Sequence, residues 1–319
     1  MKPEVTLSLD LDNKWSYMKI HGDKGWEDFP SYLDRCVPRI LEVLRERNWR
    51  ITFFIVGKDA EISQNHEAIY QIVSAGHEIA NHSFNHEPWL HLYSEKELMD
   101  EISRAEEAIE KLSGIKPVGF RGPGYSISPS VLKILLQKGY KYDCSTFPTF
   151  IGPVVRLFYF LKSSKMPDEE KHKRERLFGV FSDGFQPLKP YFWQLGDRKI
   201  LEIPVTTFPI LKTPIHVSYL LYLAEFSESL AIAYFKSAIN LLKKLGIHFS
   251  LLLHPLDFLS GEEVHELKFF PAMSMPTAKK LEVLNRIFDL LDNSFTVVNI
   301  AAYADKIKTE KLAVRAIDE

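Results

Sequence analysis

The 319-residue sequence predicts an α/β fold in which parallel strands form a closed or partly closed barrel surrounded by helices. The first observation is that short apolar runs alternate with amphipathic helical patterns along most of the chain. Such alternation implies right-handed crossovers and a parallel sheet. The second is the number of these units, about seven or eight, which fits a (β/α) barrel better than an open sheet. The third is the length, which suits one large domain, 1–319, that carries an insertion.

The expected strands are short runs rich in β-branched and aromatic residues, as a buried, pleated sheet requires. They comprise residues 5–10, 51–56, 77–80, 118–120, 142–144, 200–204, 249–253 and 295–299. In a (β/α) barrel the active residues lie at the C-terminal ends of the strands. Polar residues that follow these runs are therefore candidate site residues.

The expected helices span residues 94–114, 128–139, 227–246 and 277–293. The first has Ser94 as N-cap, Glu97 completing a capping box, and Gly114 as its stop. The second has a proline at its first position, after a serine cap, and a glycine past its end.

The segment 147–198 interrupts this alternation, because it is too long for an ordinary connection. It joins aromatic residues to a basic run. These residues are Phe147, Phe150, Phe158, Tyr159, Phe160, Lys165, Lys171, Lys173, Arg174 and Arg176. Three interpretations remain open: a helical hairpin closing one edge of the barrel, a homo-oligomer interface, or a surface that binds a sugar or a phosphate-bearing, lipid-linked glycan at a membrane.

The charge and composition restrict the class of partner. The formal net charge is −2, which argues against nucleic acid, because a nucleic-acid partner calls for a basic face. The two cysteines, Cys36 and Cys144, are interpreted as buried free thiols in a reducing compartment. The N-terminus resembles a strand rather than a signal peptide, and no apolar run reaches the length of a membrane span. We therefore expect a soluble, cytoplasmic protein, with peripheral membrane contact left open.

Two carboxylates end the first expected strand, in the sequence SLDLDNKW. Residues two apart share a face of a strand, so Asp10 and Asp12 point the same way into the barrel mouth. Two close carboxylates repel each other unless a cation separates their roles. Two other interpretations stay open at this motif: a turn with aspartate caps, and the cation-binding motif of a nucleotide-sugar glycosyltransferase.

Histidines and one arginine follow three other strands. In HSFNH, His82 and His86 are spaced to ligate one ion, and a carboxylate with two imidazoles suits zinc or a similar divalent metal. His77 and His91 are assigned mainly to structure. In FRGPGYS, a fixed guanidinium can orient a carboxylate, although the motif alone also fits a tight turn. In LLLHP, a histidine ends a buried strand, where it could be catalytic or a satisfied core residue.

Taken in chain order, Asp-x-Asp, His-x-x-x-His, Arg-x-Pro and Leu-Leu-His-Pro resemble the polysaccharide deacetylase family, also called carbohydrate esterase family 4. The resemblance runs from about residue 4 to 300, apart from the insertion. It implies a distorted (β/α) barrel of about seven strands. It also implies metal-dependent hydrolysis of an N-acyl amide on a sugar.

The resemblance carries roles to matching residues. Asp10 is the implied general base and His254 the implied general acid, while the implied metal ligands are Asp12, His82 and His86. Arg121 would orient the base, and the backbone N–H of Tyr125 would complete an oxyanion hole.

The sequence also departs from the family pattern. A leucine separates the two aspartates, which are usually adjacent, but both still share one face of the strand. The usual Asp and Trp motif near the acid is not evident. Asp143 is a candidate for pairing with Arg121 or supporting the site, and Trp193 for lining the pocket. Asp257 lies close to the implied acid and is expected to cap a turn.

The predicted function is that of a hydrolase that removes an N-acyl group from a small-molecule or glycan substrate. The first candidate for this group is N-acetyl. Zinc is the first candidate metal. A lipid-linked or nucleotide-linked amino sugar fits the expected location. The alternatives are hydrolysis of an N-formyl group or a non-sugar amide on the same fold, and a non-catalytic glycan-binding protein.

Overall fold

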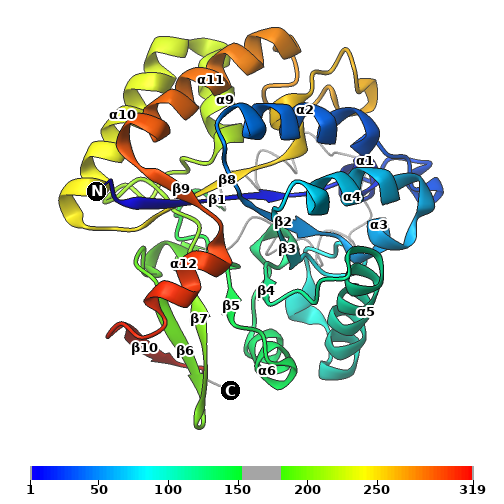
Figure 1. Ribbon diagram of the computed structural model, residues 1–319, viewed down its shortest axis with the longest axis vertical. Coiled ribbons are helices and arrows are strands. Elements are labelled where there is room, and N and C mark those ends of the chain that lie inside the picture. The colour runs from blue at the N-terminus through cyan, green and yellow to red at the C-terminus, as the bar shows by residue number, and fades with distance from the viewer. Residues whose placement is uncertain (1, 153–180, 318–319) are drawn as a thin grey trace.

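A computed structural model describes residues 2–152 and 181–317 as an α/β fold with helices packed around a mostly parallel sheet (Figure 1). The strands β8, β1, β2, β3, β4, β5 and β7 are neighbours in that order, and every adjacent pair among them is parallel. The described strands do not close a ring of hydrogen bonds, because the ladder ends at β8 on one side and β10 on the other. The predicted α/β fold with a distorted barrel is confirmed, and its open ladder is the distortion.

All eight expected strands are present, each within a few residues of its predicted bounds. Together with two further strands, they make up the strands of the described residues: β1 (Glu4–Asp10), β2 (Thr52–Ile55), β3 (Glu78–Asn81), β4 (Gly119–Phe120), β5 (Tyr142–Asp143), β6 (Tyr191–Leu195), β7 (Arg198–Glu202), β8 (Phe249–Leu253), β9 (Thr296–Val298) and β10 (Ala313–Ala316). The sequence did not predict β6 and β10. β6 pairs antiparallel with β7 across a tight turn, and β10 adds parallel to β6 at the sheet edge.

The predicted helix boundaries are also confirmed. The helices are α1 (Lys14–His21), α2 (Leu33–Glu46), α3 (Gly57–Glu61), α4 (His66–Ser74), α5 (Glu95–Ser113), α6 (Pro129–Lys138), α9 (Val217–Phe226), α10 (Glu228–Leu245), α11 (Thr277–Ser294) and α12 (Ile300–Ile307). Ser94 and Glu97 form the capping box of α5, and Gly114 ends it with φ 71°. A glycine accepts this left-handed conformation without the clash that a Cβ would bring.

The core that positions the site lies between the sheet and α2, α9, α10 and α11, which cover its upper side in Figure 1. β1 runs through the middle of this core, and every residue from Val5 to Asp10 is buried. Its neighbours on the two sides are β8 and β2. Burial of β1 on both sides holds the C-terminal end of the strand, and the aspartates there, in fixed positions.

Part of the segment 147–198 lies outside the described residues, which omit 153–180. The aromatic and basic residues expected to form a binding or interface surface fall there, namely Phe158, Tyr159, Phe160, Lys165, Lys171, Lys173, Arg174 and Arg176. The part that is described contains a 3-10 turn, Phe181–Phe185, and the strand β6. This part extends the sheet, and the three interpretations of the segment stay predictions.

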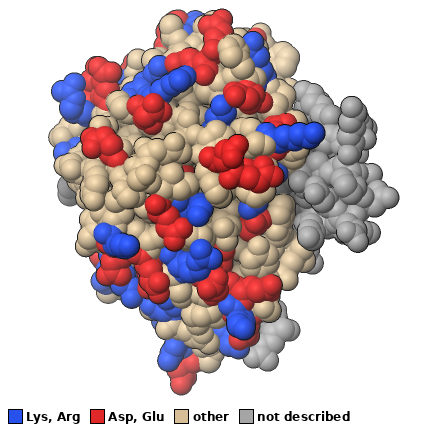
Figure 2. Space-filling view, turned by 90° about the vertical axis from the view of Figure 1, so that its right-hand side faces the viewer, with Lys and Arg blue, Asp and Glu red and all other residues tan. Residues whose placement is uncertain are grey.

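The surface and the thiols agree with the compositional predictions. Cys36 and Cys144 are buried and free. On the face that carries α1, α3, α4 and α5, basic and acidic side chains are interspersed, and neither sign gathers into a patch (Figure 2). Within the described ranges, no helix combines the length and the apolar character needed to cross a membrane.

Candidate functional site

The predicted site residues lie at the ends of parallel strands. Asp10 is the last residue of β1, Arg121 follows β4, and His254 follows β8. His82 follows β3, which ends at Asn81. Because these strands are parallel, their C-terminal ends meet at one edge of the sheet. The location expected from the sequence is therefore confirmed for each of these residues.

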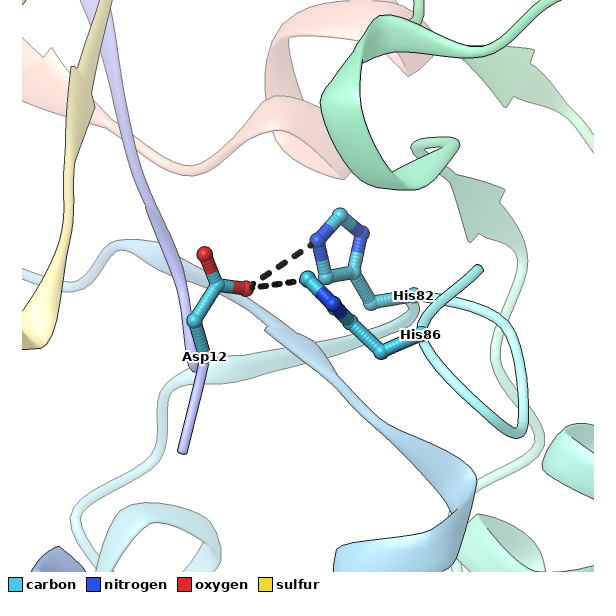
Figure 3. A group of neighbouring side chains, drawn as sticks. All are labelled: Asp12, His82 and His86. Atoms are coloured by element: carbon cyan, nitrogen blue, oxygen red, sulfur yellow. Dashed lines mark hydrogen bonds and ion pairs between the residues drawn. The ribbon is translucent and has the colours of Figure 1, made fainter. Parts of the chain in front are cut away.

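Asp12, His82 and His86 form a compact group of three possible metal ligands (Figure 3). Asp12 Oδ1 lies 2.9 Å from His86 Nε2 and 3.3 Å from His82 Nε2. The three donor atoms lie within 4.8 Å of one another, and all three residues are buried. In Figure 3 both imidazoles, from one loop, turn toward the carboxylate that follows β1.

The loop that carries the histidines is held by buried polar contacts. Asn81 Oδ1 accepts the backbone N–H of Ser83 at 2.8 Å. Glu101, from α5, accepts the backbone N–H groups of Phe84 and Asn85 at 3.0 and 2.5 Å. His86 has φ 52°, an uncommon conformation for a residue with a Cβ. Such strain persists where the surrounding contacts fix the backbone, and here it places His86 beside Asp12.

The hydrogen bond at the far side of His82 determines which nitrogen faces Asp12. His82 Nδ1 donates to the carbonyl oxygen of Arg121 at 2.6 Å, so in the neutral ring Nε2 carries a lone pair. A lone pair 3.3 Å from a carboxylate oxygen needs a proton or a cation between the two. A divalent cation meets this need together with Asp12 and His86, so these residues fit a metal ion.

The same group is strongly coupled electrostatically. Burial by itself would raise the pKa of Asp12, yet His86 and His82 hold that pKa well below its ordinary value. Burial would lower the pKa of His82, but the carboxylates of Asp10 and Asp12 raise it above its ordinary value. The site therefore favours an ionised Asp12 that faces positive charge. A bound cation would also supply that positive charge.

Asp10 is paired with Arg121, the arrangement that the family resemblance implied. Arg121 Nη1 donates to Asp10 Oδ1 at 2.5 Å and to Ser8 Oγ at 3.1 Å. Its Nε donates to the carbonyl of Cys144 at 3.1 Å, and its guanidinium lies 4.1 Å from the centre of the Phe54 ring. The arginine is fully buried, and the charge of Asp10 raises its pKa against the effect of burial. The guanidinium thus stays charged and fixes one carboxylate oxygen of Asp10.

His254 is half-buried and is held by Ser218 and Asp257. Its Nδ1 lies 3.1 Å from Ser218 Oγ. Its backbone N–H donates to Asp257 Oδ2 at 2.8 Å, so Asp257 caps the turn as predicted. Burial raises the pKa of Asp257, and the nearby His254 and Ser218 oppose that rise. No sequence pattern indicated Ser218, which lies 36 positions from His254 and reaches it from α9.

Tyr125 lies in the turn after Arg121, with φ 61°. Its backbone N–H donates to the carbonyl of Gly122 at 3.0 Å. An oxyanion role would therefore require this N–H to be shared or released, and the role stays a prediction. The phenol ring stacks on Phe147, with centroids 4.5 Å apart. Burial raises the pKa of Tyr17 well above its ordinary value, and the charge of Asp12 adds to this rise; the sequence did not suggest Tyr17.

The two residues proposed for substrate contact behave differently. Asp143 does not pair with Arg121. It is fully buried and accepts the Ser145 hydroxyl at 2.7 Å, while Ser145 Oγ accepts the N–H of Gly122. It therefore supports the turn after Arg121 from behind and does not face a substrate. Trp193 lines a cavity of about 570 Å³ together with Tyr125, and its contact with a substrate stays a prediction.

Asp59, in α3, supports the segment after Asp12 and was not predicted. Its Oδ1 accepts Asn13 Nδ2 at 2.7 Å, Asn65 Nδ2 at 2.8 Å and Trp15 Nε1 at 2.9 Å. Its Oδ2 is buried with no hydrogen-bond partner among the described residues. Burial raises the pKa of Asp59 to about 7, against the effect of these donors.

We expect this raised pKa to appear in the pH dependence of stability. A carboxyl that binds its proton more tightly when folded makes the free energy of unfolding fall as pH rises from about 4 to about 7, by at most about 1.4 kcal/mol per pH unit. Asp59→Asn removes this contribution, so the stability of wild type relative to the variant should fall across that window. Urea denaturation of both proteins at several pH values measures the difference. A constant difference would contradict the raised pKa.

Fold and site together define a barrel-type α/β protein with an Asp–His–His group and a buried Asp–Arg pair at the strand ends. Residues 23–142 match the sequence model of the polysaccharide deacetylase family. Over this stretch, about two fifths of its length, the chain is similar to that family. A structure described as a polysaccharide deacetylase from Mycobacterium smegmatis shares the fold, with a TM-score of 0.66 and 21% identity over 100% of this chain and 94% of that one.

Two curated relatives are peptidoglycan deacetylases. The chain is 29% identical to "Peptidoglycan deacetylase" of Helicobacter pylori over 44% of this chain and 48% of that protein. It is 33% identical to "Peptidoglycan-N-acetylglucosamine deacetylase" of Bacillus cereus over 32% of this chain and 36% of that protein. The chain thus spans less than half the length of these relatives.

Proposed function

We propose that the protein is a metal-dependent hydrolase that removes an N-acyl group from an amino sugar. The first candidate for this group is N-acetyl. The observation that carries this proposal is the group Asp12, His82 and His86 beside the buried pair of Asp10 and Arg121. A non-catalytic glycan-binding protein has no need for this combination. The names of the curated relatives support an N-acetyl sugar as substrate.

Asp12, His82 and His86 would hold the ion, and zinc is the first candidate because one carboxylate and two imidazoles suit it. When bound, a divalent ion acidifies water and polarises the acyl carbonyl. Asp10 would take the proton of the attacking water, through the carboxylate oxygen that Arg121 leaves free.

His254 would protonate the leaving nitrogen, which is a poor leaving group without a proton. For this role His254 would be an imidazolium, whose Nδ1 donates to the Ser218 hydroxyl while Nε2 holds the proton for the leaving nitrogen. The products would be a free amine on the sugar and a carboxylic acid. The same residues would hydrolyse an N-formyl group or a non-sugar amide, so the acyl group and the substrate remain proposals. The substrate that we would test first is a cytoplasmic intermediate in which the amino sugar is linked to a lipid or a nucleotide. A lipid-linked substrate would also require a peripheral membrane contact.

The test is a hydrolysis screen on protein stripped with a chelator and then restored with one divalent metal at a time. The panel contains N-acetylglucosamine oligomers, nucleotide-linked and lipid-linked N-acetyl sugars, N-formyl sugars and a non-sugar amide. Release of amine that depends on added metal supports the proposal, and the preferred substrate identifies the class. No hydrolysis with any metal, despite sugar binding, would favour the glycan-binding alternative.

Asp10→Asn is expected to reduce hydrolysis roughly 10²- to 10⁴-fold, the usual contribution of a positioned general base. Asparagine keeps an oxygen that can accept from Arg121, so the variant should fold and bind metal as the wild type does. The measurement is kcat on the substrate found in the screen, with metal content determined on the same sample. An unchanged kcat at full metal occupancy would show that Asp10 is not the base.

A further inference from the structure

We propose that the cavity lined by Trp193 and Arg315 binds the anionic group, a carboxylate or phosphate, of an acidic saccharide. The inference rests on the proposed function, because it names a class of substrate for the same site. The cavity has a volume of about 570 Å³ and is lined by the start of α6, the segment after β5, the segment before β6, and the strands β6 and β10. β6 and β10 lie outside the residues that match the family sequence model.

Arg315, on β10, supplies the positive charge of the cavity. Its Nη1 donates to Gln186 Oε1 at 2.6 Å, and its guanidinium lies 5.7 Å from the ring centres of both Tyr191 and Trp193. Within residues 2–152 and 181–317 no carboxylate forms an ion pair with it. A guanidinium held by an amide and two rings, rather than by an acid, can still accept a carboxylate or phosphate from a ligand.

The aromatic lining points to a sugar as the body of this ligand. Trp193 is half-buried, and its Nε1 donates to Glu202 Oε2 at 3.1 Å, which fixes the indole plane. Tyr125 and Phe147 line the cavity as a stacked pair. Rigid rings offer apolar area to the C–H face of a sugar, and nearby polar groups can meet its hydroxyls. The lining contains the polar side chains of Ser128, Thr146 and Gln186, and also the carboxylate of Asp183.

The cavity borders the candidate catalytic site through the same stacked pair. Tyr125 belongs to the turn that begins after Arg121. Phe147 lies 5.8 Å from the ring of His216, which in turn lies 6.1 Å from the ring of His254. The stacked pair of Tyr125 and Phe147 therefore has Arg315 on one side and the proposed acid, His254, on the other. A saccharide that crosses it would present its acyl group to the metal ligands and its anionic group to Arg315.

The test uses sugars without an amide, so binding does not depend on hydrolysis. Calorimetry on the metal-free protein compares glucose, glucose 6-phosphate, glucuronic acid and inorganic phosphate. The wild type is expected to bind at least one acidic sugar about tenfold or more tightly than glucose, a difference of about 1.4 kcal/mol. The two acidic sugars distinguish a phosphate from a carboxylate as the preferred group.

Arg315→Gln should abolish the preference for the acidic sugar, and Trp193→Ala should weaken binding of every sugar. Lys199→Gln is the matched control, because Lys199 is an exposed cation on β7 that does not line the cavity. Equal binding of all sugars by the wild type, or a preference that survives in Arg315→Gln, would overturn the proposal. Inorganic phosphate binding as tightly as the sugar phosphate would overturn its saccharide part. Selective binding without any hydrolysis would contradict the proposed function alone.

Discussion

Replacing His82 by alanine is expected to abolish stoichiometric binding of a divalent metal and to reduce amide hydrolysis roughly 100-fold or more. His82 contributes one of two imidazoles that face Asp12, and its Nδ1 is already held by the carbonyl of Arg121. The variant leaves one carboxylate and one imidazole, too few ligands for a stable zinc site. Metal content by mass spectrometry and kcat on the same preparation measure both effects.

His91→Gln is the matched control, because His91 lies in the same region and contacts Ser126 rather than the candidate metal ligands. It should keep full metal content and activity. Circular dichroism of His82→Ala checks that the fold survives. A His82→Ala protein that folds and still holds one ion per chain would show that the ligand assignment is wrong.

The sequence was sufficient to predict the strand ends, because apolar periodicity locates the strands and parallel topology brings their ends to one edge. That reasoning placed Asp12 near His82 although they lie 70 positions apart. It did not place β10, a largely exposed strand of four residues without a continuous apolar run. Nor did it place β6, which lies inside the segment that breaks the alternation.

The sequence also could not predict which buried polar groups pair with one another. Asp10 and Asp143 both end strands near Arg121, and nothing local in the sequence distinguishes them as its partner. In the structure Asp10 receives the guanidinium, while Asp143 turns to Ser145. The support that Ser218 gives to His254 depends likewise on packing between distant segments. Such contacts follow from the tertiary fold, so residue patterns along the chain do not reveal them.

Arg121→Met is expected to reduce the free energy of unfolding by about 3–5 kcal/mol, because it leaves the buried carboxylate of Asp10 without its cation. Methionine retains much of the apolar stem but none of the donors to Asp10, Ser8 and Cys144. Urea denaturation in the presence of a chelator measures this cost without a contribution from bound metal. Arg104→Met on α5 is the control, since Arg104 is exposed and its ion pair with Asp100 spans 3.7 Å. That change should cost less than about 1 kcal/mol.

The double variant Asp10→Asn/Arg121→Met separates the buried charge from lost packing. If the uncompensated carboxylate causes most of the loss, asparagine at position 10 should restore part of the stability, and the two changes should be strongly non-additive. Additive costs would show instead that Arg121 acts mainly through its contacts with Ser8, Cys144 and Phe54. Hydrolysis should stay low in the double variant in either case, because both the base and the group that orients it are gone. The stability result thus tests the pair as a structural unit, and the activity result tests whether that unit serves the proposed chemistry.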